Sequence, residues 1–266
     1  MKKVECIGLF SLISVLSCKK HPVSGQAPAS MADSVAIPQK TEEGLPVKKY
    51  DYEVGWMEDY EKLPKLEFIE IRESEFHKVP KDSVRTMPQI DMGDEEFAIQ
   101  TWKKRHVFDL YRDYGGVRGH EGHEYLGYYP GLKLFAITSN WTGESMGFGK
   151  LVLIDSITDK EYGIVSIGDV PVELPLPSIN NKYMVYYDNW MYDHKDCTIC
   201  VVQIGNKANP DDYLREYRIY ESHDFAIDEI RWIDDNSFVV RGYEDVYENG
   251  DWTKNSNIIK LPSNNP

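Results

Sequence analysis

The chain has 266 residues, of which 41% are hydrophobic and 28% charged, so it can build a core and is too balanced in composition for wholesale disorder. Its 44 acidic residues against 30 Lys and Arg give a formal net charge of -14. A surface that acidic repels phosphate backbones, and we expect no nucleic-acid partner. Four cysteines exclude a disulfide-dense scaffold.

The N-terminus has the pattern of a secretory leader. Lys2 and Lys3 precede an apolar stretch, Ile7–Leu16. As a helix this stretch would span about half of a ~30 Å hydrocarbon core, so it suits a cleaved signal better than a permanent membrane span. We therefore predict a signal peptide over residues 1–17.

The residues at the end of this leader, Val15-Leu16-Ser17-Cys18, resemble a bacterial lipobox, in which a small residue precedes a cysteine that is lipidated. The resemblance implies that Cys18 becomes the lipid-modified N-terminus of a cell-envelope lipoprotein. Lys19 rather than Asp follows the cysteine, and by resemblance to the sorting pattern of enteric bacteria this implies anchoring in the outer membrane. The alternative is an ordinary secretory signal that happens to contain Cys18.

Residues 18–49 have the composition of a flexible tether. They contain Pro, Ser, Ala and Gly, and no Phe, Trp or Tyr. Such a segment cannot bury enough apolar surface to offset the entropy lost on ordering. Aromatic residues return at Tyr50, so we predict a folded body over residues 50–266.

This body consists of short apolar runs separated by Asn, Asp, Gly and Pro, which predicts strands joined by turns. No segment has a long helical period. The clearest predicted strands are Leu132–Thr138, Leu151–Asp155, Tyr183–Tyr187, Thr198–Ile204 and Phe238–Arg241. We therefore predict an all-β fold of antiparallel sheets.

The predicted strands recur within an internal sequence repeat. Residues 172–187 align without gaps on residues 227–242, at an offset of 55, and each segment has a strand, a polar turn and a second strand. Residues 132–137 align with residues 181–186, and a fainter copy places Phe97 on Phe135. The repeats are expected at about 90–115, 124–166, 172–221 and 227–261.

The turns at Pro177–Tyr183 and Trp232–Phe238 resemble the Ser-Pro-Asp-Gly-Lys turn of TolB/PD40-like and WD40-like β-propeller repeats. The resemblance implies a small or incomplete propeller of about four blades, because a single blade cannot bury both of its faces. The alternative is an antiparallel β-sandwich or meander whose hairpins look alike because turn chemistry is limited.

The densest group of potential metal ligands is His120, Glu121, His123 and Glu124. Imidazole and carboxylate groups suit Zn²⁺ and similar ions. The two histidines are three residues apart rather than four, and the flanking glycines argue against a helix, so this is not a zincin motif. A loop could turn the ligands inward, whereas the alternative is a solvated connection between two β units. We expect no cofactor elsewhere.

Cys197 and Cys200 have the CxxC spacing of redox motifs, but they open an apolar run that predicts a strand. Residues three apart in a strand face opposite sides, roughly 10 Å apart, which is too far for a disulfide. We therefore expect two strand thiols, at least one of them buried. A turn at Thr198-Ile199 would instead permit a disulfide.

Two further segments are candidates for function. A predicted loop between strands combines aromatic and polar side chains and is the best candidate for an exposed binding surface, through Asn189, Trp190, Tyr192, Asp193 and His194. Ser145 fits the letters GxSxG, but the glycines after it discourage the helix that a nucleophile elbow requires, which favours a hairpin loop. We assign no catalytic residue.

The sequence thus predicts a bacterial cell-envelope lipoprotein with a non-catalytic binding body. Its partners would be the membrane, through the lipid anchor, and an envelope protein or glycan. The alternative function is that of a hydrolase or lyase acting on glycans, which could use a metal held by the group around His120.

Overall fold

The computed structural model divides the chain into two units, Met1–Val47 and Lys48–Pro266. The structure describes residues 50–55, 61–81, 84–112, 121–143, 146–190, 195–248 and 250–263. The predicted signal peptide, Cys18 and the predicted tether lie outside these residues. No helix in the described ranges is long and apolar enough to cross a membrane.

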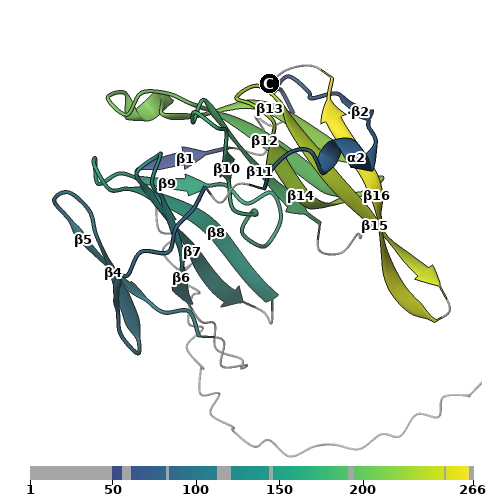
Figure 1. Cartoon of the computed structure of the whole chain (residues 1–266). Coiled ribbons are helices and arrows are strands. Elements are labelled where there is room, and N and C mark those ends of the chain that lie inside the picture. Colours follow the sequence, from purple (N-terminus) through teal and green to yellow (C-terminus); the bar gives the residue numbers. More distant parts are fainter. Residues whose placement is uncertain are drawn as a thin grey trace, which may run out of the picture. The chain divides into compact units, whose positions relative to one another are not determined.

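The second unit contains four open sheets, which we number in chain order (Figure 1). Sheet I has β3 (Asp91–Met92), β4 (Glu96–Gln100) and β5 (Arg105–Asp109). Sheet II has β6 (Glu121–Tyr129), β7 (Leu134–Gly143), β8 (Met146–Asp155) and β9 (Glu161–Ile164), with β1 (Tyr52–Val54) parallel to β9. Sheet III has β10 (Leu176–Pro177), β11 (Tyr183–Asn189), β12 (Cys197–Ile204) and β13 (Leu214–Ser222). Sheet IV has β14 (Ala226–Trp232), β15 (Phe238–Glu248), β16 (Asp251–Pro262) and β2 (Phe68–Glu70). The only helices in the described residues are the one-turn α2 (Glu73–Phe76) and a 3₁₀ turn, η1 (Pro210–Asp212).

The predicted all-β class with antiparallel sheets is confirmed. Apart from the β1–β9 pair, the strands of every sheet pair antiparallel. The burial patterns explain why these residues form strands. In β5, buried His106 and Phe108 alternate with exposed neighbours, because one face of sheet I is covered. All four residues of β9 are buried, because sheet II is covered on both faces.

The sheets pack face to face in chain order, with one core between each neighbouring pair. Between sheets I and II the core includes Phe97, Ile99, Phe108, Ile137, Val152 and Ile154. Between sheets II and III it includes Leu134, Leu153, Tyr162, Met184, Tyr186 and Cys200. Between sheets III and IV it includes Val185, Ile199, Val201, Ile230, Phe238 and Val240. Layering of open sheets fits the sandwich alternative.

The far face of sheet IV is covered by the helix α2. Phe76 and Val79 pack there against Val239 and Ile259. The guanidinium of Arg231 lies 4.3 Å from the centroid of the Phe76 ring and donates to the carbonyl of Val79 at 2.9 Å. In a closed ring, sheet I would pack against this face of sheet IV. Within the described residues, the helix α2 covers it instead.

Sheets II, III and IV are oriented alike, so that their equivalent turns lie side by side. The backbone N–H and the side-chain amide of Asn180 each donate to the carboxylate of Asp235 at 2.6 Å, and these two residues are 55 apart. Nζ of Lys182 donates to Oδ1 of Asn236 at 2.6 Å. On the other side, a Cβ added to Gly131 would lie 2.8 Å from Nδ2 of Asn181. The turn at Gly131 is therefore in close contact with the side chain of Asn181 in the neighbouring turn.

Sheet I has the opposite orientation. The alignment of Phe97 with Phe135 implies that the end of the β4–β5 hairpin lies beside the end of the β7–β8 hairpin. Instead, the backbone N–H of Trp102 in that hairpin donates to the carbonyl of Ser156, which follows β8, at 2.9 Å. Leu110, after β5, bridges His123 near the start of β6. The strand period sets which face a residue takes but not the direction of the strand.

The described parts of the segment from residue 50 to residue 87 join three of the sheets (Figure 1). β1 pairs with β9, Lys65 bridges Ile219 on β13, and β2 pairs with β16. After α2 the segment turns back to the first strands of the sheets. There Thr86 exchanges two backbone hydrogen bonds with Tyr128 on β6, at 2.8 and 2.9 Å.

Candidate functional site

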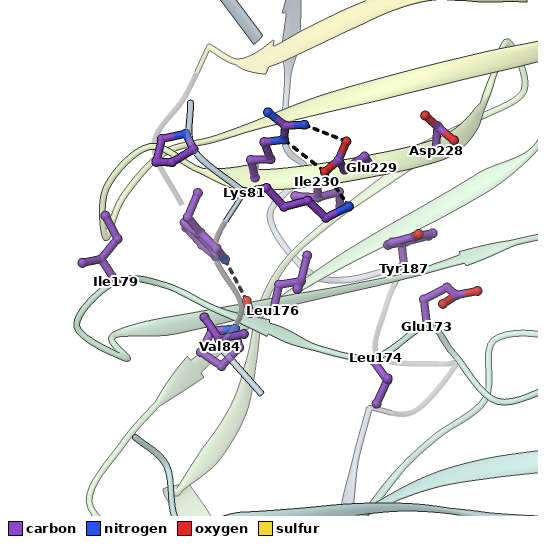
Figure 2. Close-up of a pocket in the computed structure, with 14 residues that line it drawn as sticks. Lys81, Val84, Glu173, Leu174, Leu176, Ile179, Tyr187, Asp228, Glu229 and Ile230 are labelled. Atoms are coloured by element: carbon purple, nitrogen blue, oxygen red, sulfur yellow. Dashed lines mark hydrogen bonds and ion pairs between the residues drawn. The ribbon is translucent and has the colours of Figure 1, made fainter. Parts of the chain in front are cut away.

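A groove of about 260 Å³ lies where the first strands of sheets III and IV, β10 and β14, meet Pro80, Lys81 and Val84 of the returning segment (Figure 2). Its walls are mostly apolar, and its polar groups gather toward two places. The apolar lining includes Val84, Leu174, Leu176, Ile179, Ile230 and Trp232, and the polar lining consists of Lys81, Glu173, Tyr187, Asp228, Glu229 and Arg231. A second hollow of about 370 Å³ shares Val84, Leu174 and Leu176 with the groove and extends to Tyr129 on β6.

Local sequence explains the shape of this groove. β10 is only two residues long and ends at Pro177, and Pro175 precedes it, so the strand has few N–H groups with which to pair. Trp232, at the end of β14, donates its indole N–H to the carbonyl of Leu176 at 2.7 Å. This bond holds β14 against β10 and places the indole in the wall.

Glu229 is the centre of the basic part of the groove. Its carboxylate accepts hydrogen bonds from Arg231 at 3.0 and 3.1 Å and from Arg241 at 2.9 Å, and it lies 3.1 Å from Nζ of Lys81. Burial acts to raise the pKa of Glu229, but hydrogen bonds from Arg231 and Lys81 outweigh burial and lower it. Glu229 therefore stays ionised and serves to join β14, β15 and the returning segment.

The other polar part is acidic, with Glu173, Tyr187 and Asp228 close together at one side of the groove (Figure 2). Oδ2 of Asp228 accepts a hydrogen bond from Nε of Arg241 at 2.7 Å. Glu173 is exposed, and its carboxylate has no cationic partner among the described residues. Burial, and then the negative charges of Glu173 and Asp228, raise the pKa of the Tyr187 phenol, which keeps its proton and can act as a donor. This part of the groove can accept a cation.

The internal repeat is the signal that could have identified this acidic pair. Glu173 and Asp228 are 55 residues apart, so the repeat places them at equivalent positions in neighbouring units. Sequence reasoning used that alignment only for strands and turns and missed the pair. Lys81 and Val84 reach the groove through the returning segment, which no local pattern predicts.

The structure separates the three described members of the predicted metal group. Glu121, His123 and Glu124 lie on β6 rather than in the expected loop, so Glu121 and His123 share one face and Glu124 takes the other. Oε2 of Glu124 accepts from Thr138 at 3.3 Å and from Asn140 at 3.0 Å. His120 lies outside the described residues, which contain no group of three His, Cys, Asp or Glu able to hold a metal ion. The metal site and the enzyme that would use it stay predictions.

The predicted binding loop is described only at its start. The Asn189 side chain accepts from the N–H of Ile227 at 2.8 Å and donates to the carbonyl of the same residue at 2.9 Å, so it fastens β11 to β14. Trp190 is exposed. Tyr192, Asp193 and His194 lie outside the described residues, as does Ser145, so this surface is not tested.

The expectation of two strand thiols at the CxxC is confirmed. Cys197 and Cys200 are both buried thiols on β12. Cys197 belongs to the core between sheets III and IV, whereas Cys200 belongs to the core between sheets II and III. Burial, and then the charges of Asp196 and Asp188, raise the pKa of Cys197 to about 12, so the thiolate is scarce.

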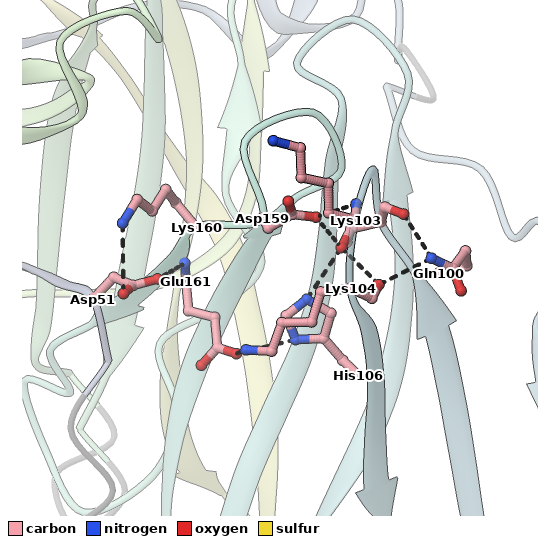
Figure 3. A network of polar contacts seen from close by, with 9 residues as sticks. Asp51, Gln100, Lys103, Lys104, His106, Asp159, Lys160 and Glu161 are labelled. Atoms are coloured by element: carbon pink, nitrogen blue, oxygen red, sulfur yellow. Dashed lines mark hydrogen bonds and ion pairs between the residues drawn. The ribbon is translucent and has the colours of Figure 1, made fainter.

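A buried polar network between sheets I and II contains a hydroxyl, an imidazole and a carboxylate in line (Figure 3). Nε2 of His106 lies 3.2 Å from Oγ1 of Thr101, and Nδ1 lies 3.1 Å from Oε1 of Glu161. All three residues are buried, and the Thr101 hydroxyl donates to Asp159 at 2.5 Å. A nucleophile must face substrate, so this network has a structural role.

Comparisons with protein-family models, with curated proteins and with solved structures find no match for this chain. Its function must therefore be inferred from its own residues.

Proposed function

We propose that this chain is a bacterial cell-envelope lipoprotein, anchored in the outer membrane through Cys18, whose β body is a non-catalytic binding module. Support for the lipoprotein assignment comes from the basic and apolar leader, the lipobox-like end of that leader and the tether composition of residues 18–49. Support for a propeller-like origin comes from sheets II, III and IV, whose equivalent turns lie side by side. Sheet I and α2 cap the two ends of this array.

We assign binding to the groove between β10 and β14. The observation that carries this assignment is an apolar groove of about 260 Å³ with an exposed carboxylate, Glu173, that has no cationic partner in the described part of the chain. An apolar side chain would fill the groove, and a neighbouring cation would pair with Glu173. The ligand is therefore a protein segment in which a basic residue adjoins an apolar one. The net charge of -14 speeds the approach of such a segment.

Synthetic peptides test the groove directly. Fluorescence anisotropy is measured with a labelled Lys-Leu-Val-Lys peptide and with its Glu-Leu-Val-Glu counterpart. We expect the basic peptide alone to bind, and the Glu173→Lys variant to weaken that binding at least tenfold. Asp94→Lys, which makes the same charge change on an exposed turn of sheet I, should leave binding unchanged. Equal binding of the two peptides, or an unaffected Glu173→Lys variant, would contradict the assignment.

Metabolic labelling tests the anchor. Cells that express the full chain or its Cys18→Ala variant are grown with radiolabelled palmitate. We expect label on the wild-type protein and none on the variant. Label that persists in the variant, or is absent from both proteins, would contradict lipid anchoring through Cys18.

A further inference from the structure

On the face of sheet II that packs against sheet I, β7 and β8 carry two stacked aromatic rings that lie outside the core shared by the two sheets. Trp141 on β7 and Phe148 on β8 are directly opposite in the strand register. Their ring centroids are 5.8 Å apart with an angle of 17° between the planes. Trp141 is 36% exposed, and Phe148 is half-buried. The pair therefore forms a partly exposed apolar cluster, in which Trp141 is the more accessible ring.

Polar groups border this surface on the same face of the sheet. Glu121 on β6 is opposite Trp141 in register and exposed. The next row of the same face contains His123, Ser139 and Lys150, in register with one another. Nζ of Lys150 forms an ion pair with Glu53 and lies 5.4 Å from the centroid of the Tyr50 ring. The rings are thus followed, two residues along each strand on the same face, by polar side chains.

We infer that Trp141, Phe148 and Glu121 form a carbohydrate-binding site for a glycan strand of pyranose sugars. One face of a pyranose presents C–H groups with partial positive charge, which stack on the negative face of an aromatic ring. The hydroxyl groups around its edge need hydrogen-bond partners, and the exposed Glu121 carboxylate supplies acceptors for them.

Two other occupants fit the surface less well. A stable protein interface buries about 800 Å² on each partner and has an apolar centre of many side chains, whereas the apolar area here consists of two rings edged by charged residues. A lipid surface of anionic headgroups would be repelled by a chain of net charge -14. The surface is also separate from the groove between β10 and β14, so the two proposals stand or fall independently.

Sedimentation with insoluble polysaccharide tests this inference. The purified full chain is mixed with chitin and with cellulose, and the bound fraction is compared with that of Trp141→Ala, Glu121→Gln and Trp102→Ala. Trp102 is the matched control, because it is 71% exposed but lies on the hairpin of sheet I. We expect the wild type and Trp102→Ala to bind at least one polymer equally. We expect Trp141→Ala to bind at least tenfold less and Glu121→Gln three- to tenfold less.

Circular dichroism checks that each variant is folded. Failure of the wild type to bind either polymer would overturn the inference, and so would equal losses in Trp141→Ala and Trp102→Ala. A Glu173→Lys variant, altered only in the groove, should sediment like the wild type.

Discussion

The interface between sheets III and IV and the interface between sheets I and II are built from different chemistry. The first is apolar through its depth, with Val185, Ile199 and Phe238 in one continuous core. Its polar contacts include that of Asn180 with Asp235 at the surface turns, and the part-buried bonds of Trp232 to Leu176 and of Asn189 to Ile227. The second also has an apolar core, but it adds a buried polar layer in which His106 lies between Thr101 and Glu161.

Orientation accounts for this difference. Sheets III and IV are oriented alike, so their equivalent turns meet. The two sides of that contact are the same turn of the repeat in neighbouring units. Sheet I is reversed, and no equivalent turn faces it. Apolar contacts are not directional, whereas a misplaced buried hydrogen bond leaves an unsatisfied group. A reversed sheet therefore depends on its polar layer for a unique position.

The largest expected effect is in the apolar interface. Phe238 is fully buried, and its ring lies 5.2 Å from that of Trp232. Phe238→Ala should lower the free energy of unfolding by about 3–5 kcal/mol, because it leaves a cavity between two sheets. Urea unfolding followed by circular dichroism measures this change. The control is Ile233→Ala, at an exposed neighbouring position, which should change stability by no more than about 0.5 kcal/mol. A loss below about 1 kcal/mol in Phe238→Ala would show that the interface can collapse.

A smaller and more local effect is expected in the polar layer. Thr101→Val keeps the shape of the side chain but removes the hydroxyl that bonds Asp159 and faces His106. We expect a loss of about 1–3 kcal/mol, since buried partners are left unsatisfied. Hydrogen exchange should accelerate in β4 and β5 and stay unchanged in β15. Val107→Ala, at an exposed position of β5, serves as the control. Unchanged protection of β4 and β5 would mean that the apolar core alone positions sheet I.

The smallest effect concerns Asp188, on the face of β11 opposite the groove. Burial, and then repulsion by Glu173, raise its pKa from 3.8 to about 6. Between these two values the folded state binds more protons than the unfolded state, so stability is lost as the pH rises from about 4 to 6. Asp188→Asn removes this cost and should be more stable than the wild type by about 1–2 kcal/mol at pH 8.

The same comparison at pH 4 is the control for Asp188. There the carboxyl is protonated in the folded state, and urea unfolding should give nearly equal stabilities for the two proteins. An equal difference at both pH values would mean that packing rather than charge is responsible. A more stable Asp188→Asn variant would show that the Asp188 carboxylate, unlike that of Glu161 beside His106, is a buried charge without a compensating partner.

Local chemistry predicted the strands, and long-range contacts decided what local chemistry could not. The alternating pattern of β5 and the apolar run of β12 indicate strands directly, and the spacing of Cys197 and Cys200 places them on opposite faces. The direction of the strands of sheet I relative to those of sheet II could not be predicted, because the two-residue alternation of buried and exposed side chains is the same in both directions. His123 was expected in a loop because of its glycine neighbours, yet Gly122 packs against the backbone of Tyr111 and requires that residue type within a strand.

The pairing of β2 with β16 has a consequence for the order in which the protein folds. Lys260 and Glu70 are bonded across 190 residues of chain. Residues 68–70 are therefore synthesised long before the strand that completes them, and sheet IV keeps an open edge until the last residues arrive. Contacts of such long sequence separation slow folding, because the chain between them must be closed first. The same late step covers the edge of β16 at Lys260–Pro262, so completion of the fold also protects this part of the edge against pairing with a second copy.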